Sequence, residues 1–167
     1  SDHGYHLGHH GLWQKSDLFE GSVRVPMIIS VPGTKQAGNN SEALVELIDL
    51  YPTLADLCGL PKPPHLKGKS IVQVLNDPSK TVRNAAFTVT RARGKLPRGV
   101  KGSKPLGHTI RTERYRYTEW GGGKHGIELY DYKVDPDEFT NLAKIPSSKK
   151  TLNRMQELMQ STRERTR

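Results

Sequence analysis

The distribution of apolar and polar residues predicts a strand early in the chain. Met27–Val31 is a nearly continuous apolar run, and Pro32-Gly33 closes it. A run of this kind is typical of a strand that is buried on both faces, as in an α/β sheet. Pro26 stands at its start, where the sheet does not require an N–H donor. We therefore expect residues 27–31 to form a buried strand.

Residues 50–58 instead place apolar side chains at helical spacing. Asp49 stands at the N-cap position, Pro52 falls in the first turn and Gly59 follows the last apolar residue. These are the residue types expected at the ends of a helix. A shorter helix is predicted over residues 70–76. The apolar face of the first helix would consist of Leu50, Leu54, Leu57 and Cys58.

The second half of the chain alternates between apolar and polar residues, which predicts strands. A tight turn is expected at Thr112-Glu113, and Gly121–Gly123 would form the tip of another loop. A final helix is expected after Ser148, because apolar residues recur there at helical spacing. The predicted strands cover residues 86–90, 108–111, 114–120 and 127–131, and the apolar face of the final helix holds Leu152, Met155, Leu158 and Met159.

Together these elements indicate an α/β (α+β) chain in two parts. Residues 1–83 have the pattern of the end of an α/β sheet. Residues 84–167 have the pattern of a small antiparallel sheet packed on a C-terminal helix. The single cysteine, Cys58, excludes an internal disulfide, and its apolar surroundings predict a small buried side chain. The sequence contains no run that is long and apolar enough to cross a membrane.

The net charge of +9 is unevenly distributed. Residues 1–90 carry eight basic and eight acidic side chains, whereas residues 91–167 carry 18 basic and nine acidic ones. Residues 91–107 form a basic loop that is rich in Gly and Pro. A basic surface attracts polyanions, such as sulfated polysaccharide or nucleic acid, but it can equally be a solvated face. A strand would place Arg114 and Arg116 on one face and the tyrosines that follow them on the other, and we do not favour nucleic acid as a partner.

The first 15 residues hold the densest chemistry, with four of the seven histidines, an aspartate, three glycines and a lysine. Asp2 and His3 are adjacent oxygen and nitrogen donors, and glycines let a backbone approach a ligand closely. Lys15 adds a cation at the end of the stretch. This composition suits a metal cation and an oxyanion bound side by side. The alternative is a surface loop in which Asp2 is a turn residue and Lys15 is solvated.

Ser1-Asp2-His3-Gly4, with Gly8, Gly11, Trp13 and Lys15 at their spacing, resembles the second conserved block of the sulfatases in the alkaline-phosphatase superfamily. Further similar blocks follow in the same order through almost the whole chain. The segment 111–120 is most similar to that of the iduronate-2-sulfatase group. The other similar blocks are Val25–Ile28, Val31–Gly33, Asp49–Ala55, Gly68–Ser70, Glu128–Asp131, Asp135-Pro136 and Asn141-Leu142.

The resemblance implies a role for several of these residues. Asp2 and His3 match two ligands of a divalent metal, most often Ca²⁺, although Ca²⁺ usually prefers oxygen donors. Lys15 matches a catalytic lysine that contacts the sulfate, where it would neutralise charge on the transferring group. His10 and Trp13 are candidate substrate contacts. The substrate class implied is a sulfated sugar or a glycosaminoglycan-like polymer, and the compartment implied is periplasmic, secreted or lysosomal.

Sulfatases use a formylglycine nucleophile that is made from Cys or Ser in a C/S-x-P-x-R motif, and this motif does not occur here. We therefore expect a C-terminal part of a sulfatase, with residues 1–83 from the catalytic domain and 84–167 forming a small subdomain. The N-terminal part of the same protein would supply the formylglycine and further metal ligands, and the chain alone would be inactive. The alternatives are a phosphoester or phosphonate hydrolase of the same superfamily and a non-catalytic polyanion-binding module.

Overall fold

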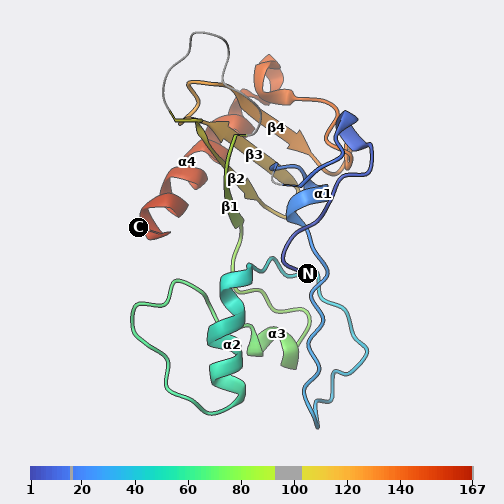
Figure 1. Cartoon of the computed structure of the whole chain (residues 1–167), viewed down its shortest axis with the longest axis vertical. Helices are drawn as coiled ribbons and strands as arrows, with labels where there is room; N and C mark the ends of the chain where they lie inside the picture. The colour runs from blue at the N-terminus through green and yellow to red at the C-terminus, as the bar shows by residue number, and fades with distance from the viewer. Residues whose placement is uncertain (16, 93–102, 167) are drawn as a thin grey trace. The chain divides into compact units, whose positions relative to one another are not determined.

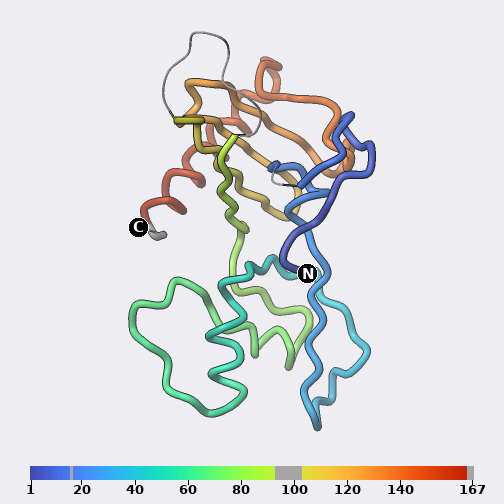
Figure 2. The backbone as a smooth tube through the Cα atoms, in the orientation of Figure 1, coloured from blue at the N-terminus to red at the C-terminus, as the bar shows by residue number. Residues whose placement is uncertain are grey.

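The computed structural model describes residues 1–15, 17–92 and 103–166 (Figures 1 and 2). Most of the basic loop predicted at 91–107 therefore lies outside the described residues. The chain forms two compact units: the sheet unit, Ser1–Pro26 with Phe87–Arg167, and the helical unit, Met27–Ala86. Within the described ranges, no helix has the length and apolar character needed to span a bilayer.

The sheet unit is built on four strands that lie in chain order (Figure 1). β2 pairs with β3 in the antiparallel direction, and β3 pairs with β4 in the same way. These pairs are local in sequence because antiparallel strands can be joined by short turns. The predicted strands are confirmed to within two residues: they are β1 (Ala86–Arg91), β2 (Leu106–Arg111), β3 (Tyr115–Trp120) and β4 (Ile127–Asp131).

The two faces of this sheet carry different chemistry. Tyr117 lies opposite Ile110 on β2 and Leu129 on β4, and all three side chains are buried. The preceding residue, Arg116, lies opposite Arg111. Because successive side chains of a strand point to opposite faces, Tyr117 and Arg116 face opposite sides of the sheet. The predicted separation of Arg and Tyr is therefore confirmed.

Helix α4 (Lys149–Thr166) covers the face of the sheet that carries Tyr117. It packs against β2 and β3, and its buried side chains Leu152, Met155 and Met159 recur at helical spacing. The predicted apolar stripe is thus confirmed, and the helix begins directly after Ser148. The remaining helical segments are η1 (His9–Gly11), α1 (Glu20–Val23), η2 (Leu47–Asp49), α2 (Leu50–Leu57), α3 (Val72–Asn76), η3 (Leu142–Lys144) and η4 (Pro146–Ser148).

The helical unit is organised around Asp49, which is fully buried. Its carboxylate accepts hydrogen bonds from the backbone N–H of Glu46 at 2.8 Å and of Lys69 at 2.7 Å, and it pairs with Arg83. A Cβ at Gly68 would lie 2.0 Å from a backbone oxygen of η2, so only glycine permits this close approach. One carboxylate therefore ties together three segments of the unit.

Two details predicted for α2 are wrong. Asp49 makes no side-chain cap of α2, because its carboxylate belongs to a capping box with Glu46 around η2. Leu54 is 56% exposed and Cys58 is also exposed, whereas the buried face holds Pro52, Thr53 and Ala55. Helical spacing gives the period of a face, but the neighbouring segments decide which face is covered.

The predicted strand at Met27–Val31 is also wrong. These residues belong to no strand, and Ile28 is 93% exposed. Figure 2 shows this segment entering a long open loop. A strand requires a neighbour that accepts and donates its backbone hydrogen bonds, and no segment among the described residues pairs with it. The apolar pattern alone could not reveal the absence of a pairing partner in this part of the chain.

Candidate active site

The first 15 residues form a loop with two arms. The N–H of His6 donates to the carbonyl of Gln14 at 2.9 Å, and the N–H of Gly8 donates to that of Leu12 at 2.8 Å. At the turn between the arms, Gly8 has φ +104° and His10 has φ +54°. Positive φ is easy for glycine and uncommon for other residues, so His10 holds a conformation that the surrounding loop imposes.

The loop packs closely against α1. The N–H of Gly4 donates to the carbonyl of Ser22 at 2.9 Å. A Cβ at Gly4 would lie 1.9 Å from the carbonyl oxygen of Gly21, and a Cβ at Gly21 would lie 2.8 Å from the His6 ring. Any larger residue at either glycine would push the loop away from α1. The position of the loop is thus set by α1 as well as by its own hydrogen bonds.

Asp2, His3 and Lys15, predicted as site residues, lie together. Nδ1 of His3 lies 2.8 Å from the carbonyl oxygen of Gly4, which can only accept, so Nδ1 carries the proton and Nε2 keeps its lone pair. The Lys15 ammonium donates to this Nε2 at 2.8 Å, and an Asp2 oxygen lies 3.7 Å from it. A hydrogen bond from its own backbone and the proximity of His3 lower the pKa of Asp2. Asp2 is therefore a carboxylate at neutral pH.

His10 and Trp13, the candidate substrate contacts, differ in their surroundings. The Trp13 side chain is 69% exposed. The His10 ring stacks on Phe19 at 4.0 Å and lies 5.0 Å from the ring of Phe139, far along the sequence. Trp13 is accordingly open to a ligand, whereas His10 is engaged in an aromatic cluster within the sheet unit.

Asp2 and His3 have the donor chemistry of a divalent metal site, with a carboxylate and an imidazole whose Nε2 is unprotonated. In the part of the chain that the structure describes, no group of three or more His, Cys, Asp or Glu side chains could hold a metal ion. Two donors are far fewer than the roughly 6–8 ligands that Ca²⁺ takes. The loop therefore fits part of a metal site.

The sequence did not identify Asp17 as important, yet its carboxylate holds the loop and α1 together. It accepts hydrogen bonds from His6 Nε2 at 3.1 Å, from the N–H of Phe19 at 2.9 Å and from the Ser22 hydroxyl at 2.7 Å. The His6 residue is only 3% exposed. Because a carboxylate accepts, Nε2 of His6 carries the proton that it shares with Asp17.

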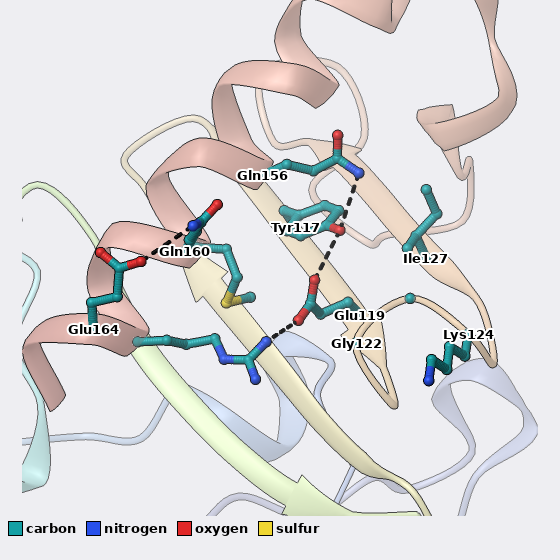
Figure 3. A pocket seen from close by; sticks show the side chains of 11 residues that line it. Tyr117, Glu119, Gly122, Lys124, Ile127, Gln156, Gln160 and Glu164 are labelled. Carbon is teal, nitrogen blue, oxygen red and sulfur yellow. Dashed lines mark hydrogen bonds and ion pairs between the residues drawn. The ribbon is translucent and has the colours of Figure 1, made fainter. Parts of the chain in front are cut away.

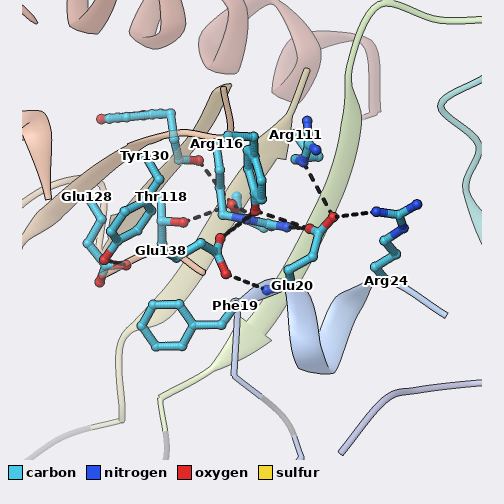
Figure 4. Close-up of polar contacts among 12 residues, drawn as sticks. Phe19, Glu20, Arg24, Arg111, Arg116, Thr118, Glu128, Tyr130 and Glu138 are labelled. Atoms are coloured by element: carbon cyan, nitrogen blue, oxygen red, sulfur yellow. Dashed lines mark hydrogen bonds and ion pairs between the residues drawn. The ribbon is translucent and has the colours of Figure 1, made fainter. Parts of the chain in front are cut away.

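A second cluster holds α1 against the sheet (Figure 4). Nε of Arg116 contacts Glu138 at 2.6 Å and the Tyr132 hydroxyl at 2.8 Å, and its Nη2 pairs with Glu20. Burial alone would lower the pKa of Arg116, but Tyr132, Glu138 and Glu20 together raise it. We call Arg116, Glu20, Glu138 and Tyr132 the α1 anchor.

Sequence reasoning missed the α1 anchor because its members are far apart in the chain. Arg116 stands in an alternating strand pattern, where a charged residue normally points to solvent, yet it is 1% exposed. Glu138 lies after the end of β4, outside any helix or strand, and it has φ +60° and is 3% exposed. The sequence signal for this cluster was weak. Arg116 stands between two tyrosines, in a strand whose two neighbouring strands carry apolar residues.

On the opposite face of the sheet, an open groove of about 700 Å³ runs between α4 and the β3–β4 turn (Figure 3). Its lining is polar and apolar in similar measure, and internal contacts occupy several of the polar groups. Glu119 pairs with Arg163 at 2.6 Å and accepts from the Tyr117 hydroxyl at 3.2 Å. Burial raises the pKa of Tyr117 to about 12. None of the catalytic, substrate-binding or metal-binding residues predicted from the sequence lines this groove.

Comparison with known proteins gives consistent matches along the chain. The family model for N-sulphoglucosamine sulphohydrolase, C-terminal, matches residues 8–165. Arylsulfatase K of Mus musculus is 33% identical over 146 residues, which cover 86% of this chain and 26% of that protein. Iduronate 2-sulfatase of Mus musculus is 30% identical over 197 residues, with 81% and 36% covered. The predicted similarity to iduronate 2-sulfatase is confirmed, and arylsulfatase K is similar to a comparable degree.

Solved structures give the same result. A protein in complex with its substrate D-glucosamine-2-N,6-O-disulfate superposes with a TM-score of 0.85 at 28% identity, covering 99% of this chain and 33% of that one. A phosphonate monoester hydrolase of Agrobacterium radiobacter superposes with a TM-score of 0.83 at 30% identity, covering 98% and 34%. The chain thus spans about a quarter to a third of the length of these relatives. By the match over residues 8–165, the chain belongs to the N-sulphoglucosamine sulphohydrolase C-terminal family of the sulfatases.

Proposed function

We propose that this chain is the C-terminal part of a sulfatase that hydrolyses sulfate esters of a sulfated sugar. The observation that carries the proposal is the family match over residues 8–165, which includes Lys15 of the opening loop. There the Lys15 ammonium lies 2.8 Å from His3 Nε2. A cation and a neutral nitrogen donor lying side by side suit a sulfate oxyanion next to a metal cation.

In this proposal each residue of the loop has a separate task. Asp2 and His3 would bind the divalent cation, most often Ca²⁺ in sulfatases, through the carboxylate and the unprotonated Nε2. When bound, such a cation stabilises negative charge on the sulfuryl oxygens. Lys15 then moves its hydrogen bond from His3 to the sulfate and neutralises charge that develops as the S–O bond breaks. Trp13 supplies an exposed ring for the sugar, and His10 contacts the substrate from the edge of its aromatic cluster.

The remainder of the parent protein supplies what these residues lack. Sulfatases generally use a formylglycine nucleophile as well as the metal, and in the proposal both the nucleophile and further metal ligands come from the N-terminal part. Residues 1–83 then belong to the catalytic domain and 84–167 to a small C-terminal subdomain. The same N-terminal part covers exposed apolar side chains such as Ile28 and Leu54. The compartment proposed from the family is periplasmic, secreted or lysosomal.

The relatives support a sulfated carbohydrate as the substrate class. One similar structure holds D-glucosamine-2-N,6-O-disulfate, and another is described as a 2-O GAG sulfatase. The similarity to a phosphonate monoester hydrolase keeps a phosphonate or phosphodiester substrate as the second candidate. It is less favoured, because the family model and the curated relatives above are sulfatases. A non-catalytic polyanion-binding module is less favoured for the same reason.

The decisive experiment measures sulfate release by the purified parent protein from 6-O-sulfated and N-sulfated glucosamine, with a phosphonate monoester as the second substrate. We expect sulfate release, and we expect Lys15→Ala to lower kcat about 100-fold, because one preorganised charge contact in a transition state is worth roughly that factor. Lys67→Ala, at an exposed position of the helical unit, is the matched control and should change kcat less than twofold, within about 0.5 kcal/mol.

Three results would contradict the proposal: hydrolysis of the phosphonate alone, hydrolysis of neither substrate, or full activity of the Lys15→Ala protein. A fourth result would show that the rest of the parent protein is not needed for activity. The 167-residue chain by itself should release no sulfate, so activity of that chain would show that it contains a nucleophile of its own.

A further inference from the structure

The loop that carries His3 and Lys15 is held together by its own hydrogen bonds, and contacts with α1 set its position in the sheet unit. The N–H of Gly4 donates to Ser22 in α1 at 2.9 Å, and Asp17, just before α1, accepts from His6 at 3.1 Å. These contacts lie at either end of the segment 17–22. Any shift of this segment is therefore transmitted to the loop.

The segment 17–22 is in turn attached to the sheet by the α1 anchor. The backbone N–H of Glu20 donates to Glu138 at 2.7 Å, and the Glu20 carboxylate pairs with Arg116. Arg111 lies 3.6 Å from the same carboxylate. The Tyr132 hydroxyl bridges the two glutamates, at 2.5 Å from Glu138 and 3.2 Å from Glu20. Both a backbone group and a side chain of α1 are thus fixed by residues of the sheet and its following turn.

Burying the charged groups of the α1 anchor costs free energy. This cost argues that the position of α1 is functionally important. Arg116 is 1% exposed and Glu138 is 3% exposed, and a charge that is buried to this extent requires close partners. Glu138 also holds φ +60°, a conformation that is uncommon for a residue other than glycine. Buried apolar residues of similar volume would often give equal or greater stability, but without fixing the orientation of α1 so narrowly.

We propose that Glu138 and Arg116 are positioning residues, which hold α1 and thereby set the place of Lys15 and His3 in the active site. The inference rests on the proposed function for the role of those two loop residues. Glu138 is the most informative member, because it receives the N–H of Glu20 directly. It acts across 118 residues of sequence, from the turn that follows β4. None of the α1 anchor needs to touch the substrate.

The test compares two glutamates of the sheet unit in the parent enzyme, the buried Glu138 and the partly buried Glu128. Glu138→Gln removes the charge that Arg116 and the Glu20 N–H require, whereas Glu128→Gln changes a glutamate of β4 that contacts Trp120 and Tyr130 instead. We expect Glu138→Gln to lower kcat roughly 10–100-fold with a KM within about twofold, because small displacements of a catalytic group cost that much in rate. Glu128→Gln should leave kcat within about twofold of the unchanged enzyme.

A spectroscopic readout separates this inference from the proposed function. The imidazole ¹⁵N signals of His3 report the hydrogen bond from Lys15 to Nε2, whether or not the parent enzyme releases sulfate. They should shift in Glu138→Gln and remain in place in Glu128→Gln. If sulfate release is absent but the His3 signals respond in this way, the proposed function fails and the positioning role stands. Unchanged His3 signals, or equal losses of kcat in both variants, would overturn the positioning role.

Tyr132→Phe is a milder variant, which tests the α1 anchor even if the Glu138→Gln protein fails to fold. It keeps the ring over which Arg111 stacks at 3.6 Å, and it removes only the hydroxyl that bridges Glu20 and Glu138. The expected loss of kcat is smaller, about threefold to tenfold, with a shift of the His3 signals in the same direction as in Glu138→Gln. A Tyr132→Phe enzyme with unchanged kcat and unchanged His3 signals would count against the α1 anchor.

Discussion

The sheet unit and the helical unit both bury charged side chains, but in different structural settings. In the sheet unit, the α1 anchor lies on one face of a sheet whose other face carries an apolar layer of Ile110, Tyr117 and Leu129 beneath α4. In the helical unit, the buried Asp49 stands at the centre of the fold. In the sheet unit, the α1 anchor fixes the position of α1 on a sheet that already has an apolar layer. In the helical unit, the Asp49 carboxylate joins three segments of the chain.

The apolar runs predicted from the sequence differ between the two units in how far other segments cover them. In the sheet unit the apolar stripe of α4 is covered by the sheet, and Met155 is fully buried. In the helical unit, Ile28 is 93% exposed, and Ile48, Tyr51 and Leu54 are each about half exposed or more. The comparison of these runs teaches that an apolar pattern alone does not show whether another segment covers it.

The largest expected effect concerns the α1 anchor. Replacing Arg116 by Met leaves Glu20 and Glu138 without their shared cation, and we expect a loss of about 3–5 kcal/mol in the free energy of unfolding of the sheet unit. Arg114→Met is the control, because that arginine is about half exposed and solvent weakens its pair with Asp131, so the loss should be much smaller. Urea denaturation of the 167-residue chain measures both. Equal losses would mean that the burial of Arg116 does not distinguish it energetically.

The next effect separates the covered apolar residues from the exposed ones. Met155→Ala removes a fully buried side chain from α4, and we expect a loss of about 2–5 kcal/mol. Ile28→Ala truncates a side chain that is 93% exposed, and the free energy of unfolding of the chain should change by less than about 0.5 kcal/mol. In the parent protein the Ile28→Ala cost should rise if the N-terminal part covers this residue. A large cost in the chain alone would contradict the contrast between the two units.

The smallest effect is a pH dependence within the sheet unit. Burial, more than any other influence, raises the pKa of Glu128. The folded state therefore keeps a proton on Glu128 to higher pH than the unfolded chain does, so stability decreases as the pH rises from about 4.3 through the raised pKa. Glu128→Gln should remove this decrease and flatten the pH dependence.

Thermal unfolding from about pH 2 to about pH 8 measures this difference. Asp131 provides an internal reference of opposite sign, because the hydrogen bond from Arg114 lowers the pKa of its carboxyl. Its contribution is present above the unfolded pKa of about 3.9 and is lost as the pH falls through the lowered value. Identical pH profiles for the unchanged chain and Glu128→Gln would show that Glu128 is not protonated more readily in the folded state.

The sequence by itself was sufficient for the elements whose partners are near in the chain. β2, β3 and β4 pair through short turns, and α4 covers β2 and β3 with a stripe set by its own periodicity. The family resemblance was also readable from the sequence, because it rests on blocks such as Ser1–Gly4 and Lys15 at fixed spacing. Local spacing carries this information, since turns, helical faces and strand alternation involve neighbours within a few residues.

Only the tertiary structure decided which polar groups are buried and what each one holds. Alternation placed Arg116 on a strand face, but only the fold brought Glu20 and Glu138 to it from either end of the sequence. The apolar pattern also could not predict the exposure of Ile28, because this pattern gives no information about a pairing partner. The physical reason is common to both cases: burial depends on which surfaces meet, and surfaces that are distant in sequence meet only in the folded chain.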